Sequence, residues 1–434
     1  MMIYLKKYSF LVFLNLFIVI FILSFFLISN LDLIIIQSNY EKISSILRTS
    51  TGDQDYWPTD NWLTTKPEKQ GMNSKKLSEI YKYIEEEQVN IHSVIVVRNG
   101  YIVEEGYLSY YEVRDVKEDY SEEMHILYSV TKSITSLCIG VALKKGYIDN
   151  LSQTFFEFLP ELWNPTYDQR KKNITIHHLL TMTSGIEWDE SSNPYGSPGN
   201  DFTNMFYSTD WVQYYLDKPM EYDPGENFEY SGGSSMLLSA LIQKVTNKTT
   251  SEFADENIFT PLGILENHWR WDYAPQGITE GASGLHMTPK DMAKIGLLCL
   301  NNCTWEGEEI VSWEYIVAAT IDQQSPLSDS TYGYQFWIQW WFPYDAYAAI
   351  GYMGQCIVMF PEINMVIVFT ANEMNYNYYL DYIIENFIIT AIGVDSGITG
   401  YPIAIIWFII IIGSLGTIYL VNKKRMSAKI HKKR

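Results

Sequence analysis

The fold is approached most directly from residues 129–146, which read Ser-Val-Thr-Lys-Ser-Ile-Thr-Ser-Leu-Cys-Ile-Gly-Val-Ala-Leu-Lys-Lys-Gly. Apolar residues recur at helical spacing after Lys132, and Gly146 is suited to end a helix, so this stretch predicts a helix that begins near Ser129. Ser129 and Lys132 are three positions apart and therefore share one face of that helix. An amine then lies one turn from a hydroxyl.

A hydroxyl beside an amine can carry out nucleophilic chemistry. Serine is a poor nucleophile until a base takes its proton, and a lysine can be that base only when it is neutral. Positive potential at a helix start favours a neutral lysine, and the free N–H groups there suit a developing anion. The alternative is that Ser129 only caps the helix and Lys132 is solvated. Because a Ser-x-x-Lys pattern does not decide between these interpretations, the rest of the chain must.

Two apolar stretches predict membrane spans. Twenty residues without a charge run from Phe10 to Ser29, and another twenty run from Tyr401 to Leu420. Lysines precede the first stretch and a basic tail follows the second, so both termini are expected in the cytoplasm and the central part outside, at the cell membrane. An uncleaved anchor is favoured at the N-terminus, with a signal peptide as the alternative.

The composition excludes several classes of partner and cofactor. Removing the seven positive charges of the C-terminal tail from a net charge of −20 leaves −27 on the remainder, which argues against nucleic acid. Four cysteines are too few for a disulfide framework, and a bridge between Cys299 and Cys303 is not favoured. The seven histidines are scattered, so we expect no metal site and no cofactor.

Strand signals lie at the two ends of the central part. Asn99-Gly100 predicts a hairpin after a helix that begins at Asn73-Ser74, and strands are expected at 332–341, 346–351, 356–360 and 365–370, before a last helix at about 379–392. Short helices and turns fill the region between. The pattern predicts an antiparallel sheet built from both ends of this region, carrying a helical insert.

Two further stretches bear on the chemistry. Tyr230-Ser231-Gly232 follows a loop, and a phenol beside an ammonium has a reason to ionise or to relay a proton. In the stretch from Gly351 to Gln355, a glycine permits a substrate to approach closely and the next backbone N–H can point at an oxyanion. Taken alone, Tyr230 would more simply be one of the 33 tyrosines of the chain, with a structural role. The alternative for the stretch from Gly351 to Gln355 is a plain edge strand or a bulge.

Together these motifs resemble the penicillin-recognising serine hydrolases, which include class C β-lactamases, D-alanyl-D-alanine carboxypeptidases, related esterases and 6-aminohexanoate-dimer hydrolases. The resemblance spans about residues 68–393 and also includes the stretches 178–185 and 281–288. It implies an α/β fold of the β-lactamase/transpeptidase type, with an antiparallel sheet flanked by helices, an all-α insert domain and the site between the two.

The resemblance assigns a role to each motif. Ser129 would be the nucleophile, Lys132 its base and Tyr230 the group that passes a proton to the leaving group. The N–H groups of Ser129 and Gln355 would form the oxyanion hole. The remaining oxyanion or substrate-binding candidates are Gly354, Tyr352 and Ser231.

Two departures from the family pattern limit the choice of substrate. Tyr352 stands where penicillin-binding members carry a Lys or His that helps hold the substrate carboxylate, and Gly232 stands where they carry an Asn that contacts the substrate amide. We therefore expect poor β-lactamase activity and a small ester, amide or peptide as substrate. The tryptophans Trp337, Trp340 and Trp341 are candidates for an apolar acyl pocket, although such a run is more often core.

The predicted protein is thus a membrane-anchored serine hydrolase. Its expected parts are an N-terminal transmembrane anchor at 1–37, a tether at 38–65, the hydrolase domain at 66–395, and a transmembrane helix with a basic cytoplasmic tail at 396–434. The alternatives are a D-Ala-D-Ala-type carboxypeptidase or β-lactamase, and a sensor domain that binds substrate without turning it over.

Overall fold

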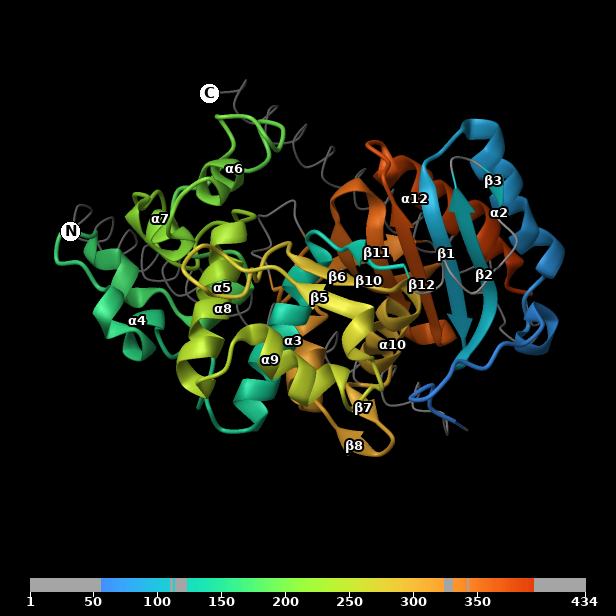
Figure 1. Ribbon diagram of the computed structural model, residues 1–434, viewed down its shortest axis with the longest axis horizontal. Helices are drawn as coiled ribbons and strands as arrows, with labels where there is room; N and C mark the ends of the chain where they lie inside the picture. Colours follow the sequence, from blue (N-terminus) through green and yellow to red (C-terminus); the bar gives the residue numbers. More distant parts are fainter. Residues whose placement is uncertain (1–55, 110–111, 114–122, 324–330, 342, 394–434) are drawn as a thin grey trace, which may run out of the picture.

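The structure of the chain is a computed structural model, which describes residues 56–109, 112–113, 123–323, 331–341 and 343–393. A sheet with helices on both faces forms one side of the molecule, and short helices form the other side (Figure 1). Both predicted membrane spans and most of the predicted tether lie outside the described residues. Within the described ranges, no helix is long and apolar enough to cross a membrane.

Seven antiparallel strands form the main sheet of the described chain, in the order β3-β2-β1-β12-β11-β10-β9. Their bounds are β1 Ile91–Arg98, β2 Tyr101–Ser109, β3 Glu112–Val113, β9 Trp337–Trp341, β10 Tyr344–Gly351, β11 Gln355–Phe360 and β12 Met365–Ala371. The first and last parts of the described chain meet in mid-sheet, where β1 pairs with β12. The predicted sheet built from both ends is confirmed.

Helices cover both faces of this sheet, so its strands are buried on both sides. Helix α2 (Ser74–Glu87), capped by the Asn73 side chain as expected, packs with the last helical segments on the outer face. Helices α3 (Val130–Lys144) and α10 (Pro289–Leu300) pack on the inner face. Helix α3 is buried along almost its whole length, which explains why its sequence has few polar residues after the first turn.

The helical side of the molecule lies between β4 and β9 in the sequence. Its helices are α4 Phe155–Phe158, α5 Ile176–Leu180, α6 Asp201–Phe206, α7 Trp211–Asp217, α8 Gly232–Thr246, α9 Thr250–Ala254 and α11 Trp313–Ala319. Small ladders are formed by β4 His125–Ile126, β5 Trp269–Trp271 and β6 Leu285–Met287, and by β7 Thr304–Trp305 with β8 Glu308–Glu309. Helix α8 packs against α3 and joins the two sides.

The structure corrects two of the predicted elements. The strand expected at 332–341 is limited to β9, because the preceding residues turn and Gln335 adopts a left-handed backbone with φ of 61°. The last helix begins earlier and is not one regular helix: α12 spans Tyr376–Ile383 and continues as a π-helical turn over Ile384–Ile388 and a 3-10 turn over Ile389–Ala391. All four cysteines are buried and unbridged.

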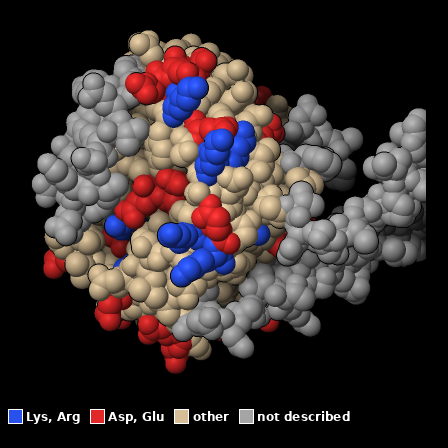
Figure 2. Space-filling model, turned by 90° about the vertical axis from the view of Figure 1, so that its right-hand side faces the viewer, with Lys and Arg blue, Asp and Glu red and all other residues tan. Residues whose placement is uncertain are grey.

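One face of the molecule carries charges of both signs. On the face shown in Figure 2, acidic and basic side chains are interspersed, and neither sign forms a continuous patch. Surface pairs such as Lys82 with Glu86 contribute little to stability because solvent screens them.

Candidate active site

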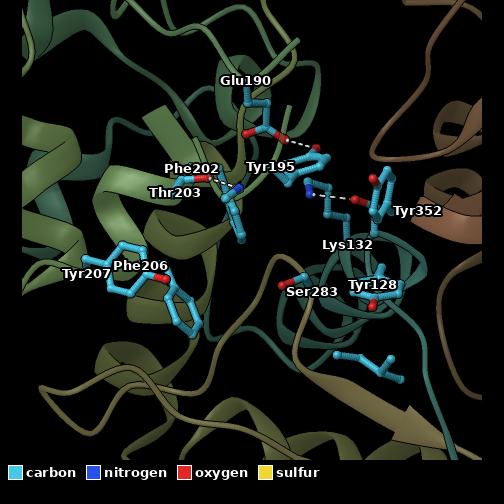
Figure 3. A pocket seen from close by; sticks show the side chains of 13 residues that line it. Tyr128, Lys132, Glu190, Tyr195, Phe202, Thr203, Phe206, Tyr207, Ser283 and Tyr352 are labelled. Atoms are coloured by element: carbon cyan, nitrogen blue, oxygen red, sulfur yellow. Dashed lines mark hydrogen bonds between the residues drawn. The ribbon is translucent and has the colours of Figure 1, made fainter. Parts of the chain in front are cut away.

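Ser129 and Lys132 come together at the start of α3. Ser129 is the residue just before the helix, and the Lys132 ammonium donates a hydrogen bond to its Oγ over 3.1 Å. The Lys132 side chain is only 2% exposed, so the solvated lysine of the alternative interpretation is ruled out. Figure 3 shows the Lys132 ammonium pointing into the cavity at the centre of the site.

The loop at 280–284 also binds the Lys132 side chain. The Lys132 ammonium donates a second hydrogen bond, of 3.1 Å, to the carbonyl of Ala282. The carboxylate of Glu280 accepts hydrogen bonds from the Ala282 and Ser283 N–H groups and thereby fixes the loop. The motif at 281–288 therefore positions the lysine.

Acidic groups surround Lys132, whereas the helix start alone would place it in a positive potential. Burial by itself would lower the pKa of Lys132, but interactions with Tyr230, Glu190 and Glu280 outweigh burial and raise the pKa above its ordinary value. The resting lysine is therefore protonated. The expectation of a lysine kept neutral by positive potential is wrong for this state, because buried carboxylates lie beside the ammonium.

Tyr230 faces the same ammonium. The Lys132 nitrogen lies 4.9 Å from the centre of the Tyr230 ring, and Trp337 stacks on that ring at 5.5 Å. Burial raises the pKa of the Tyr230 phenol, while the charge of Lys132 partly offsets this increase. The resting pair is thus a phenol and an ammonium. Trp337 supports the tyrosine, whereas Trp341 is buried in the outer core, and the Trp340 side chain lies outside the described atoms.

The motif at 178–185 anchors the Tyr230 loop. Met182 accepts a hydrogen bond from the Glu229 N–H through its carbonyl and another from the Ser231 N–H through its sulfur. The Ser231 hydroxyl caps α8 by accepting from the Ser234 N–H over 3.2 Å. Ser231 is buried and does not line the cavity, so its position is that of a helix cap.

The third motif forms the hairpin between β10 and β11. Gly351 lies against the backbone of the nucleophile, because a Cβ there would be 2.2 Å from the Leu127 carbonyl oxygen and 3.2 Å from the Ser129 nitrogen. Gln355 pairs with Gly351 across the hairpin, and its side-chain amide bonds to the backbone of Ala371. Gly354 has a φ of 94°, which suits a glycine at the turn. The oxyanion-hole role of the Ser129 and Gln355 N–H groups stays a prediction.

A cavity of about 380 Å³ opens beside Ser129 and Lys132. Tyr352 lines it, and the centre of the Tyr352 ring lies 5.7 Å from that of Tyr128 and 5.1 Å from that of Tyr195. The other described lining residues are Ile126, Glu190, Gly196, Phe202, Thr203, Phe206, Tyr207 and Ser283. Aromatic rings from the helical side therefore face Tyr352 across the cavity (Figure 3).

Glu190 is the main site residue that the sequence analysis missed. It is 4% exposed, and its carboxylate accepts hydrogen bonds from the Trp188 indole, the Tyr195 hydroxyl and the Gly232 N–H. Nothing in its local sequence distinguishes Glu190 from the neighbouring acidic residues Glu187 and Asp189. No group of residues suited to hold a metal ion occurs in the described part of the chain.

Fold and site together define a class of protein: an α/β enzyme domain with a serine nucleophile candidate at a helix start, a buried lysine one turn on and a tyrosine facing both. The comparisons with known proteins agree. A family model described as β-lactamase matches residues 80–383, so this chain belongs to the β-lactamase family of serine hydrolases, which includes penicillin-binding-protein-like members.

Among curated proteins, the chain is similar to Protein flp of Staphylococcus aureus (strain COL), with 30% identity over 180 residues. It is also similar to the monacolin J acid methylbutanoyltransferase of Aspergillus terreus, with 26% identity over 180 residues. The matches cover 41% and 38% of this chain, and 34% and 42% of the respective relatives. The chain thus matches less than half the length of either relative.

Among solved structures, the chain is similar to a Bacillus anthracis protein described as a candidate 6-aminohexanoate-dimer hydrolase. The TM-score is 0.58 at 23% identity, covering 71% of this chain and 80% of that one. A penicillin-binding protein homologue from Pyrococcus abyssi gives a TM-score of 0.54 at 21% identity, covering 71% and 76%. These likenesses establish the fold alone.

Proposed function

We propose that this chain hydrolyses a small ester or amide through an acyl-enzyme on Ser129. The observation that carries the proposal is the 3.1 Å hydrogen bond between a buried Lys132 ammonium and the Ser129 hydroxyl, with Tyr230 facing the same ammonium. Such a nucleophile with adjacent acid and base groups is the arrangement that covalent catalysis requires.

The proposed reaction has two balanced steps. After the Lys132–Tyr230 pair has lost one proton, it takes the proton of Ser129 as Oγ bonds to the substrate carbonyl carbon. Tyr230 then passes this proton to the leaving oxygen or nitrogen as the bond to the acyl carbon breaks. Water adds to the acyl-enzyme in the same way, returning the proton to Ser129 and releasing the acid.

The oxyanion that forms in each step would be bound by the N–H groups of Ser129 and Gln355. Gly351 supports this role because it lets β10 approach the Ser129 backbone closely. A donor lost from such a site costs on the order of 3 kcal/mol in the barrier.

A carboxylate-bearing β-lactam or peptide is a poorer candidate substrate. Tyr352 occupies the position at which penicillin-binding relatives carry a cation, and its hydroxyl is directed to the sulfur of Met374 at 3.3 Å. A phenol offers one hydrogen bond and no charge to a carboxylate.

The test is a panel of p-nitrophenyl esters, aminoacyl amides and nitrocefin, hydrolysed by the purified full-length chain beside a Ser129→Ala variant. We expect esters or amides to be turned over faster than nitrocefin, with turnover lost in the variant. Equal turnover by both proteins, or no turnover by either, would refute the proposal.

We also propose that the domain is held at the cell membrane and faces away from the cytoplasm. The support is the sequence at both ends: two uncharged apolar stretches with basic residues on their outer flanks. Protease added to intact cells should cleave the domain. A domain that is cut only after the cells are lysed would contradict this topology.

A further inference from the structure

The two ends of the described chain meet at one place on the domain. Tyr56, the first described residue, donates a hydrogen bond from its hydroxyl to the Gly100 carbonyl over 2.9 Å. The N–H of Gly393, the last described residue, donates to the Gly71 carbonyl over 2.9 Å. We define the exit end of the domain as the Asn99-Gly100 turn together with residues 66–76, which a hydrogen bond between the Asn99 and Gln70 side chains joins.

The catalytic site lies at the other end of the sheet. Strand β12 begins at Met365, which pairs with Arg98 next to the Asn99-Gly100 turn. The strand ends at Ala371, whose N–H donates to the side chain of Gln355 in the third motif. Six residue steps separate Met365 from Ala371. At about 3.3 Å per step, the sheet holds the site about 20 Å from the exit end.

The open side of the cavity also lies away from the exit end. Its most exposed large lining residues are Phe206, which is 54% exposed, and Tyr207, which is 78% exposed. Both lie at the end of α6, on the helical side of the molecule, whereas α2, which begins at the exit end, lies on the opposite side (Figure 1). A substrate that enters past Phe206 and Tyr207 therefore approaches from the side remote from both ends of the described chain.

The short stretch of chain after Gly393 favours one orientation at a membrane. Seven residues separate Gly393 from the predicted span that begins at Tyr401. At about 3.5 Å per residue when fully extended, they keep Gly393 within about 28 Å of that span. If the cavity faced the bilayer, these residues would have to run back along about 20 Å of sheet. With the exit end at the bilayer, no such extension is needed.

The charges along α2 agree with this orientation. Lys75 and Lys76 lie at its start, at the exit end, and the acidic run 85–87 lies at its end, close to the start of β1. A helix dipole favours the reverse order, so this arrangement does not stabilise α2 itself. It does direct lysines toward an anionic lipid surface and carboxylates away from one. The exit-end segment 66–76 as a whole holds four lysines and one acid.

We propose that the exit end faces the bilayer and that the catalytic cavity opens away from it, toward a substrate in the surrounding water. This inference rests on the proposed membrane location, and it adds the source of the substrate to the proposed hydrolase function. An ester held at a lipid headgroup would have to rise about 20 Å to meet Ser129, whereas a water-soluble ester enters the cavity directly.

Energy transfer to labelled lipid measures the orientation. The four native cysteines are buried, so a membrane-impermeant fluorescent maleimide labels a cysteine introduced at an exposed position. The full-length chain is placed in phosphatidylglycerol vesicles that carry an acceptor on the lipid headgroups. The donor positions are Lys75→Cys and Glu86→Cys on α2, and Tyr207→Cys beside the cavity. Because about 16 Å of helix separates the first two positions, we expect the transfer rate from Lys75→Cys to exceed that from Glu86→Cys at least about twofold. It should also exceed the rate from Tyr207→Cys.

The outcomes separate the orientation from the membrane location. Equal transfer from all three positions, or greater transfer from Glu86→Cys or Tyr207→Cys, would overturn the orientation and leave the membrane location standing. A chain that does not float with the vesicles in a density gradient would overturn both. Lys69→Cys and Glu85→Cys, which are also exposed, form a second pair should a variant of the first pair fail to fold.

Turnover tests the source of the substrate. The full-length chain in vesicles is given p-nitrophenyl butyrate and, separately, a phospholipid whose headgroup carries the same ester, each rate being divided by the rate with hydroxide. With Ser129→Ala as background, we expect the lipid-borne ester to react at least about tenfold more slowly, because a lipid headgroup does not span the distance to the site. Equal or faster Ser129-dependent turnover of the lipid-borne ester would overturn the inference and leave the hydrolase function standing. No Ser129-dependent turnover of either ester would overturn the hydrolase function, and energy transfer alone would then decide the orientation.

Discussion

Gly351 provides a quantitative test of how β10 positions the nucleophile. In a Gly351→Ala variant the new Cβ would lie 2.2 Å from the Leu127 carbonyl oxygen, about 1.2 Å short of an ordinary 3.4 Å contact. The atom that it meets belongs to the backbone, so no flexible side chain can move aside. Either the segment from Leu127 to Ser129 or the end of β10 must shift by about 1 Å.

A shift of this size would separate the two predicted oxyanion donors, Ser129 and Gln355. Misplacement by about 1 Å lowers catalysis by about 100-fold, and overpacking costs about 1–3 kcal/mol of stability. The assay is kcat/KM on the best ester of the panel, together with the free energy of unfolding from urea titration.

The matched control is Gly296→Ala in α10, where a Cβ would lie 2.4 Å from the Val366 side chain, away from the cavity. This variant should lose a similar amount of stability and keep its kcat/KM. A Gly351→Ala protein with the kcat/KM of the parent chain would refute the proposed support of Ser129 by β10.

Three further predictions follow from charged and polar groups. The pKa of both Lys132 and Tyr230 is raised, so the form of the pair that has lost one proton is scarce at neutral pH. The value of kcat/KM should therefore rise with pH from about 6 to 9. A flat pH profile would speak against this pair as the base. Burial raises the pKa of Glu280 to about 7 in the folded state, so Glu280 stabilises the fold most when protonated, below pH 4.5, and this stability is lost as the pH rises to about 7. Urea unfolding of a Glu280→Gln variant should show a shallower decline over that window, and an unchanged decline would be contrary to this role. Gln355→Leu should lower the free energy of unfolding by about 1–3 kcal/mol, because it removes both side-chain hydrogen bonds to Ala371. Gln276→Leu should not lower it, since the Gln276 amide is buried with no hydrogen-bond partner among the described residues. Equal losses of stability in thermal denaturation would argue against both assignments.

Local signals in the sequence were sufficient to predict the sheet and the nucleophile helix. The Asn99-Gly100 turn, the strand pair joined across residues 361–364 and the Asn73 cap depend on neighbouring residues only, and the structure confirms each of them. The strand at 332–341 was predicted too long, because only Trp337–Trp341 forms β9, and Tyr334 and Phe336 pack into the core from the turn before it.

The electrostatics of the site could not be predicted in the same way. Glu190 and Glu280 are 58 and 148 positions from Lys132 in the chain, and only the folded structure brings their carboxylates to its ammonium. The helix start that motivated a neutral lysine is present, but the buried carboxylates outweigh it. Likewise, Ser231 belongs to the catalytic motif in sequence, while its hydroxyl serves as the cap of α8.

The central claim is that Ser129 forms the covalent intermediate. The most direct measurement is intact-protein and peptide mass spectrometry of the full-length chain after treatment with a fluorophosphonate. We predict a single adduct on the peptide that contains Ser129, with no adduct in the Ser129→Ala variant and much slower labelling in Lys132→Met. An adduct on another residue, or equal labelling of the Ser129→Ala variant, would contradict the account.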